Sequence, residues 1–169
     1  AQAATVLPLE RLGDVAALED FIRRRPALVK LFDGGIIVVK PDGAGAFADY
    51  PPLPGRHEMR FDHITAVGDV IRKGRPAVGM PFIGIHVQTP MLGFAVPVRD
   101  REGRLAAVLV GVGRVQAPDL LGIVSQHRYG KTGDFVVLAT QHGVAVIGSD
   151  PTNTLRPLPK PGVSPMLDR

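Results

Sequence analysis

Two segments of the chain, one hundred positions apart, repeat the same pattern. Residues 36–51 read IIVVKPDGAGAFADYP, and residues 136–151 read VVLATQHGVAVIGSDP. Each holds an apolar strand, a polar turn with a glycine, a second apolar strand and an aspartate close to a proline. Strands joined by a Gly-containing turn predict β-hairpins, and self-similarity at a long fixed spacing indicates duplication of a whole unit. The alternative is a chance likeness between two ordinary hairpins.

The segments around the hairpins predict several helices and further strands. Apolar residues at helical spacing, with Asp14 available as an N-cap, predict helices over 14–24, 26–33, 61–73 and 118–127. Alternating and apolar runs predict short strands around 77–86 and a long hairpin over 92–99 and 104–115, and extended coil is expected after Pro151. Helices set against an antiparallel sheet predict an α+β fold.

Composition limits the classes of protein that fit. The 169 residues suit one domain or one and a fraction, and 45% hydrophobic residues are ample for a core. The net charge of +4 comes from scattered Lys and Arg, and with two Tyr and no Trp the chain gives little support for nucleic-acid binding. The absence of cysteine excludes disulfides and thiolate metal sites. No apolar run reaches the roughly 18–20 residues that span a bilayer. The start without Met or a signal peptide, and the turn-rich end, predict a fragment of a larger protein.

Short motifs give no catalytic or metal centre. Gly130-Lys131-Thr132 is like the end of a phosphate-binding loop, but the earlier glycine is missing and a strand, not a helix, is expected next. Gly111-Val112-Gly113 lies at the end of a strand without the third glycine or a following helix, which favours close approach of another backbone or a ligand. None of the five histidines pairs at helical ligand spacing, and no serine lies in a nucleophile elbow. We therefore expect no enzyme, no cofactor and no metal site.

The run from Leu31 to Val115 resembles the membrane-distal half of double Cache (PAS-like) sensor domains. The resembling pieces are LFDGGIIVVKPDGAGAFADYPPLPGR, KGRPAVGMPFIG and FAVPVRDREGRLAAVLVGV. The later run YGKTGDFVVLATQHGVAVIGSDP, with LPKPGVSPMLDR after it, resembles the opening of the membrane-proximal half, especially in versions joined to diguanylate cyclase (GGDEF) domains. The resemblance implies one Cache-like module over residues 1–116, with its N-terminal helix, and a linker helix plus an incomplete second module over 117–169.

The ligand motif of the amino-acid sensors in this family is not present. The positions that match its Arg, Trp, Tyr and Asp residues hold Ile64, Ala66, Val67, Phe82, Gly84 and Gly113. Without charged partners, burial of an amino acid's carboxylate and ammonium costs several kcal/mol. The resemblance therefore argues against an amino acid held in the family's manner.

Six other residues are expected around the cavity of the first module. They are Arg60, Asp62 and His63 at the start of a helix, Phe82 and His86 on the neighbouring strand, and Phe94 on the long hairpin. Arg is suited to a bidentate pair with a small carboxylate or anion, and His to a pH-dependent hydrogen bond. For each residue the alternative is an ordinary role, with the phenylalanines in the core and the arginine in solvent.

The resemblance implies an extracytoplasmic, periplasmic ligand-sensing domain of a bacterial inner-membrane signalling protein. The parent protein would be a diguanylate cyclase or a histidine kinase, a homodimer whose output changes when a small molecule binds the distal cavity. One alternative is a small nucleotide-binding enzyme that uses the Gly111/Gly113 or Gly130-Lys131-Thr132 segments. The other is a dimerisation module without a ligand.

Overall fold

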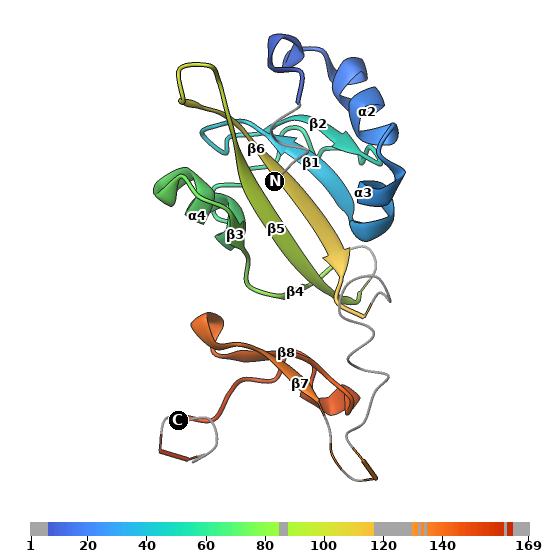
Figure 1. The fold of residues 1–169 in the computed structure, drawn as a ribbon, viewed down its shortest axis with the longest axis vertical. Coiled ribbons are helices and arrows are strands. Elements are labelled where there is room, and N and C mark those ends of the chain that lie inside the picture. The colour runs from blue at the N-terminus through green and yellow to red at the C-terminus, as the bar shows by residue number, and fades with distance from the viewer. Residues whose placement is uncertain are drawn as a thin grey trace. The chain divides into compact units, whose positions relative to one another are not determined.

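The structure is a computed structural model, and it describes residues 7–84, 88–116, 130–131, 133, 135–160 and 162–163. Contacts divide the described residues into two compact units (Figure 1). The first contains the residues up to Met80 together with Met91–Arg114, and the second contains Pro81–Pro90 and the residues from Val115 on. The assignment of these units to two duplicated modules stays a prediction.

The first unit is built around an antiparallel sheet with helices on both faces. Its elements are a 3-10 turn η1 (Leu9–Arg11), helices α2 (Val15–Arg23), α3 (Pro26–Leu31) and α4 (Thr65–Lys73), and strands β1 (Gly35–Val39), β2 (Ala46–Tyr50), β3 (Ala77–Val78), β5 (Pro90–Arg99) and β6 (Leu105–Arg114). The strand order is β2-β1-β6-β5-β3. Strand β1 lies between β2 and β6, and every one of its residues is buried, which accounts for its unbroken apolar sequence.

The two faces of this sheet carry separate cores. Alternate residues of β1 point to opposite faces: Ile37 and Val39 pack with Phe61 and α4, whereas Ile36 and Val38 pack with α2 and α3. In Figure 1 the helix α4 lies on one side of the sheet and α2 with α3 on the other. The α+β layer predicted from the sequence is confirmed.

The predicted helices of the first unit are present, with one shifted start. The Asp14 side chain accepts a hydrogen bond from the Ala17 backbone at 3.0 Å and caps α2 as expected. Helix α4 begins at Thr65 and not at the predicted residue 61. The backbone N–H of Phe61 donates to the Gly43 carbonyl at 2.8 Å, and its ring is buried, so Phe61 is held by the hairpin loop and the core outside the helix.

The second unit contains a two-stranded sheet. The elements of this unit are β4 (Phe82–Ile83), β7 (Val136–Ala139), the 3-10 turn η3 (Thr140–His142), β8 (Val144–Gly148) and the 3-10 turn η4 (Pro151–Asn153). Strands β7 and β8 form the sheet. The extended coil predicted after Pro151 is wrong at its start, where η4 forms. Beyond it the chain runs beside β8: the Ala145 N–H donates to the Arg156 carbonyl, and the Leu158 N–H donates to the Gly143 carbonyl, both at 2.8 Å. The helix predicted over 118–127 lies outside the described residues.

Both predicted hairpins form, and they belong to different sheets. In the first hairpin Ile36 pairs with Tyr50, whereas in the second Val136 pairs with Gly148. The loop between the strands is residues 40–45 in the first and 140–143 in the second, which is two residues shorter. Matching positions of the two hairpins are therefore 100 residues apart in their first strands and 98 residues apart in their second strands.

In the part of the chain that is described, every helix is too short or too polar to traverse a lipid bilayer.

Candidate functional site

A buried carboxylate lies at the edge of the first sheet. Asp49 of β2 is 0% exposed although β2 is the edge strand of its sheet. It is covered by residues 51–60, here called the strap, which runs back along β2 and is bonded to it where the Ala46 N–H donates to the His57 carbonyl at 3.0 Å. The Asp49 carboxylate accepts from the Leu53 N–H at 2.9 Å and lies 2.7 Å from His57 Nε2. One side chain thus holds the strap at two points, Leu53 and His57.

Arg56 supplies the opposite charge for this carboxylate. Its side chain is 14% exposed, and its Nη1 atom lies 3.4 Å from the Asp49 carboxylate. This atom has no hydrogen-bond partner among the described residues, so the contact with Asp49 is one of charge alone. Burial lowers the pKa of Arg56, and the nearby Asp49 charge raises it in part. A buried charge is tolerated when it is paired and hydrogen-bonded, and the Asp49 carboxylate has Arg56 as its counter-charge and hydrogen bonds to Leu53 and His57. The three residues Asp49, Arg56 and His57 form one unit, here called the strap cluster.

Arg56 and His57 were not among the residues predicted for a site, and Asp49 stood out in the sequence only as an aspartate near a proline. The sequence did contain a signal for such a cluster. Asp49 lies in the run AFADY, whose alternate residues point into a core, and a carboxylate buried there is costly unless a cation pairs with it. Which cation reaches it depends on the path of the strap, and the sequence does not specify that path.

The residues predicted at the start of the helix lie together where the end of the strap leads into α4. Arg60 holds Asp62 with two hydrogen bonds, from Nε at 3.2 Å and from Nη2 at 2.7 Å. The Nδ1 atom of His63 lies 3.9 Å from the same carboxylate. Hydrogen bonds from Arg60 hold the pKa of Asp62 below its ordinary value, and the same contact raises the pKa of Arg60. These three residues, here called the polar rim, are a solvent-facing ion pair with an imidazole beside it.

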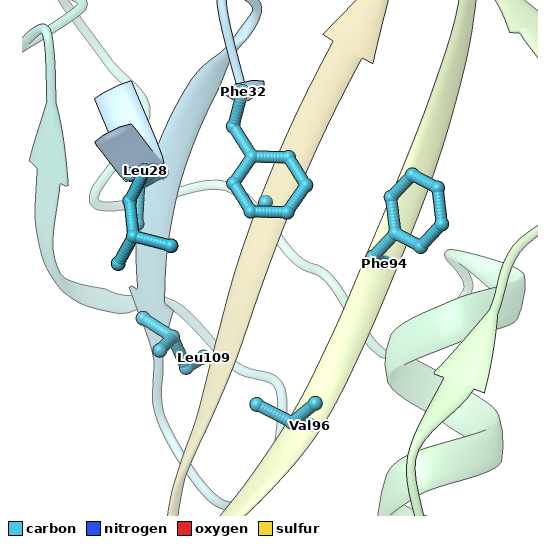
Figure 2. Close-up of a pocket in the computed structure, with 7 residues that line it drawn as sticks. Leu28, Phe32, Phe94, Val96 and Leu109 are labelled. Carbon is cyan, nitrogen blue, oxygen red and sulfur yellow. The ribbon is translucent and has the colours of Figure 1, made fainter. Parts of the chain in front are cut away.

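Phe94 faces the other side of the sheet. Its ring lies 5.8 Å from that of Phe32, centroid to centroid, on the face that α2 and α3 cover. Figure 2 shows both rings at a half-open pocket of about 80 Å³. The pocket is lined by Leu28, Phe32, Ile36, Phe94, Val96, Leu109 and Gly111. It offers no charged group and is well below the roughly 300–1,000 Å³ of typical small-molecule sites. The structure therefore does not bring Phe94 together with the polar rim.

The other two predicted site residues belong to the second unit or lie outside the described residues. Phe82 is on β4 and 40% exposed. His86 is outside the described residues, so no position is given for it. The ligand-binding role of all six residues stays a prediction.

The glycine motifs have structural explanations where they are described. Gly111 and Gly113 lie inside β6. A Cβ at Gly111 would approach the ring of Phe32 to 2.6 Å, so the missing side chain at residue 111 makes room for this ring. Among the described residues, the next element after Gly130-Lys131 is the strand β7. Among the residues that the structure describes, no group of three or more His, Asp and Glu is placed to hold a metal ion.

No protein-family model matches the chain, and no curated protein matches it. Solved structures do. The ligand-binding domain of the Pseudomonas fluorescens chemoreceptor CtaA, in complex with L-serine, superimposes with a TM-score of 0.70 at 16% identity, over 92% of this chain and 63% of that chain. The amino-acid chemoreceptor PctC of Pseudomonas aeruginosa PAO1, in complex with GABA, gives a TM-score of 0.68 at 18% identity, over 96% and 72%. The ligand-binding domain of Mlp24 with asparagine gives 0.62 at 14% identity, over 99% and 65%.

These matches establish the fold. The chain has the fold of chemoreceptor ligand-binding domains, and this confirms the Cache-like architecture expected from the sequence. It spans 63% of the CtaA domain, which is less than two thirds of that chain.

Proposed function

We propose that the chain is an extracytoplasmic ligand-sensing domain of a membrane-bound bacterial signalling protein. The observation that carries the proposal is the likeness of its fold, over 92% or more of the chain, to ligand-binding domains solved with L-serine, GABA and asparagine. Function depends on sites and not on folds, so the ligand has to be argued from this chain's own residues.

The polar rim supports a small carboxylate as the ligand. Arg60 is a planar donor, suited to bidentate pairing, with a side chain that is 66% exposed and reachable from solvent. It binds Asp62 through Nε and Nη2, which leaves the Nη1 side of the guanidinium for an incoming carboxylate. A ligand that also carries an ammonium group can pair with Asp62 at the same time, so both of its charges find a partner at the rim. The rim therefore favours zwitterions such as amino acids or GABA over simple carboxylates, in an arrangement different from the motif that the sequence lacks.

The remaining parts of the proposal concern the whole protein. We propose that the domain belongs to a homodimer anchored in the inner membrane, with a periplasmic sensor and a diguanylate cyclase as the output. The sequence similarity of residues 129–151 to Cache domains joined to GGDEF domains supports this output. A ligand changes the output only through its differential affinity for two conformations, typically about 1–3 kcal/mol.

A thermal-shift screen with acetate, GABA and L-serine tests the ligand class. A ligand at 100 times its dissociation constant stabilises the folded state by about 2.7 kcal/mol. We expect the melting temperature to rise most with a zwitterion, and the rise to be lost in Arg60→Gln. The matched control is Arg104→Gln, which removes another exposed arginine paired with an aspartate, Asp100 at 2.8 Å.

Two results contradict the assignment to the rim. If the rise in melting temperature survives Arg60→Gln, the ligand binds elsewhere. If Arg104→Gln abolishes the rise as fully as Arg60→Gln does, the effect comes from the net charge of the protein and not from the rim. If none of the three compounds, nor a wider panel of small molecules, shifts the melting temperature, the sensor proposal fails in favour of a dimerisation module without a ligand.

A further inference from the structure

The end of α3 is joined to the end of β6 across a long stretch of sequence. The Gly34 N–H donates to the Val112 carbonyl at 2.9 Å. Asp33 accepts from the backbone N–H of Arg114 at 2.9 Å and from its Nε at 2.5 Å, although the two residues are 81 positions apart. Arg114 is the last residue of the first unit before the chain enters the second. The N-terminal helices are thus bonded to the strand by which the chain leaves this unit.

One aromatic ring lies at the centre of this junction. Phe32 directly follows α3, and its ring lies against the backbone of Gly111 in β6, where a Cβ would approach it to 2.6 Å. It also contacts Phe94 of β5 at a tilt of 50°. The present position of Phe32 therefore depends on the absence of a side chain at residue 111.

The ring also borders unfilled space. Figure 2 shows Phe32 above Leu109 and Val96, with Leu28 and Phe94 to either side. The half-open pocket of about 80 Å³ lies among these side chains and has no charged lining. A ring beside such a space has a second apolar environment available within reach of a side-chain rotation.

We propose that Phe32 has two positions, one on Gly111 and one in the adjacent pocket, and that the choice between them regulates how firmly α3 is coupled to the end of β6. With the ring on Gly111, α3 is held to the strand by the ring and by the Asp33 and Gly34 hydrogen bonds. With the ring in the pocket, only the hydrogen bonds remain. This two-position contact rests on the proposed sensor function for its meaning, since a ligand that favours one position would change the connection to the second unit. Its existence is tested without any ligand.

A double-mutant cycle on the full chain provides the test. Gly111→Ala closes the first position, because a Cβ there overlaps the ring. Val96→Phe fills the pocket and closes the second position. The matched control for the glycine is Gly93→Ala on the neighbouring strand, where a Cβ would meet no atom within 4 Å. The measured quantities are the unfolding constant in urea and the hydrogen exchange of residues 112–114.

If the ring has two positions, each single variant is tolerated and the double variant is not. We expect Gly111→Ala to raise the unfolding constant less than about fivefold, with faster exchange at residues 112–114, and Val96→Phe to leave both nearly unchanged. Overpacking of a closed site costs a factor of about 5–150 in that constant, and this penalty should appear only when both substitutions are combined.

The proposal is overturned if Gly111→Ala alone shows the full penalty, or fails to fold while Gly93→Ala folds. It is also overturned if the two substitutions are additive, because the pocket then plays no part in accommodating the ring. None of these outcomes depends on ligand binding, so the two-position contact and the sensor proposal fail or stand separately.

Discussion

The two hairpins β1–β2 and β7–β8 share a sequence pattern and have different surroundings. Strand β1 is buried over its whole length between β2 and β6, whereas β7 is exposed or half-buried in a sheet of two strands. The longer loop of the first hairpin, with its additional Ala44-Gly45, shifts the second strand by two residues. Asp49 therefore pairs with Ile37 inside the sheet, and Asp150 falls beyond the end of β8. A local pattern shared by two segments can thus place similar residues in opposite environments.

The largest expected effect distinguishes these two aspartates. Asp49→Asn leaves Arg56 without its counter-charge in a buried site, and loss of one member of such a pair costs about 3–5 kcal/mol. Asp150 accepts hydrogen bonds from the N–H and hydroxyl of Thr152 in an exposed turn, and Asp150→Asn keeps an acceptor oxygen there. We expect its cost to stay below about 0.5 kcal/mol. Urea denaturation followed by circular dichroism measures the first, and hydrogen exchange of β7–β8 measures the second. Similar costs for both would mean that the strap cluster contributes little.

The next effect compares one chemical change in two strands. Val38 is 0% exposed and Val137 is half-buried. Val38→Ala should cost about 2–3 kcal/mol, because it removes buried methyl groups and leaves a cavity in a packed core. Val137→Ala should cost about 1 kcal/mol or less. Hydrogen-exchange protection of each hairpin gives both values, and a larger loss in the second hairpin would show that its strands are more covered than the structure indicates.

A smaller difference is expected between the two turn glycines. Gly43 and Gly143 both have positive φ, +73° and +63°, so alanine is strained at either by about 1 kcal/mol. At Gly43 a Cβ would also meet the Asp62 backbone at 2.9 Å, whereas at Gly143 it meets nothing within 4 Å. Gly43→Ala should therefore cost about 2 kcal/mol and disturb the polar rim, and Gly143→Ala only the strain. Equal melting temperatures for the two variants would contradict the close contact.

The smallest effect is a loss of stability of the first unit in acid. Hydrogen bonds from Arg60 lower the pKa of Asp62, and hydrogen bonds from Arg23 and Arg24 lower that of Asp20, both from 3.8. The unfolded chain then binds these protons at higher pH than the folded chain, so the stabilisation is present above about pH 4 and is lost as the pH falls below it. Both carboxylates are solvent-facing, which keeps the effect small. Melting temperatures between pH 5 and 2.5 measure it, and Asp62→Asn should reduce the slope.

Prediction from the sequence succeeded where the signal is local. The Asp14 cap, the Pro26 start of α3 and the two strands around Asp100–Gly103 depend on spacing and turn chemistry, and all are present. The candidate site was predicted less well. Arg60, Asp62 and His63 do lie together, since they are neighbours in the chain, but Phe94 faces the opposite side of the sheet. The face of Phe94 follows from strand register, and a shift of one residue reverses it.

The sequence alone determined the helices of the first unit, apart from the start of α4, together with the hairpins and the α+β layer, because periodicity and turn residues act over a few neighbouring positions. Only the tertiary structure decided that the strap carries Arg56 and His57 to Asp49, and that Phe32 comes to lie on Gly111. These contacts bring together residues that are held apart by loops. The physical reason is that a buried charge requires a counter-charge and a missing side chain leaves space for another residue. Which residue supplies the charge or fills the space depends on the path of the rest of the chain.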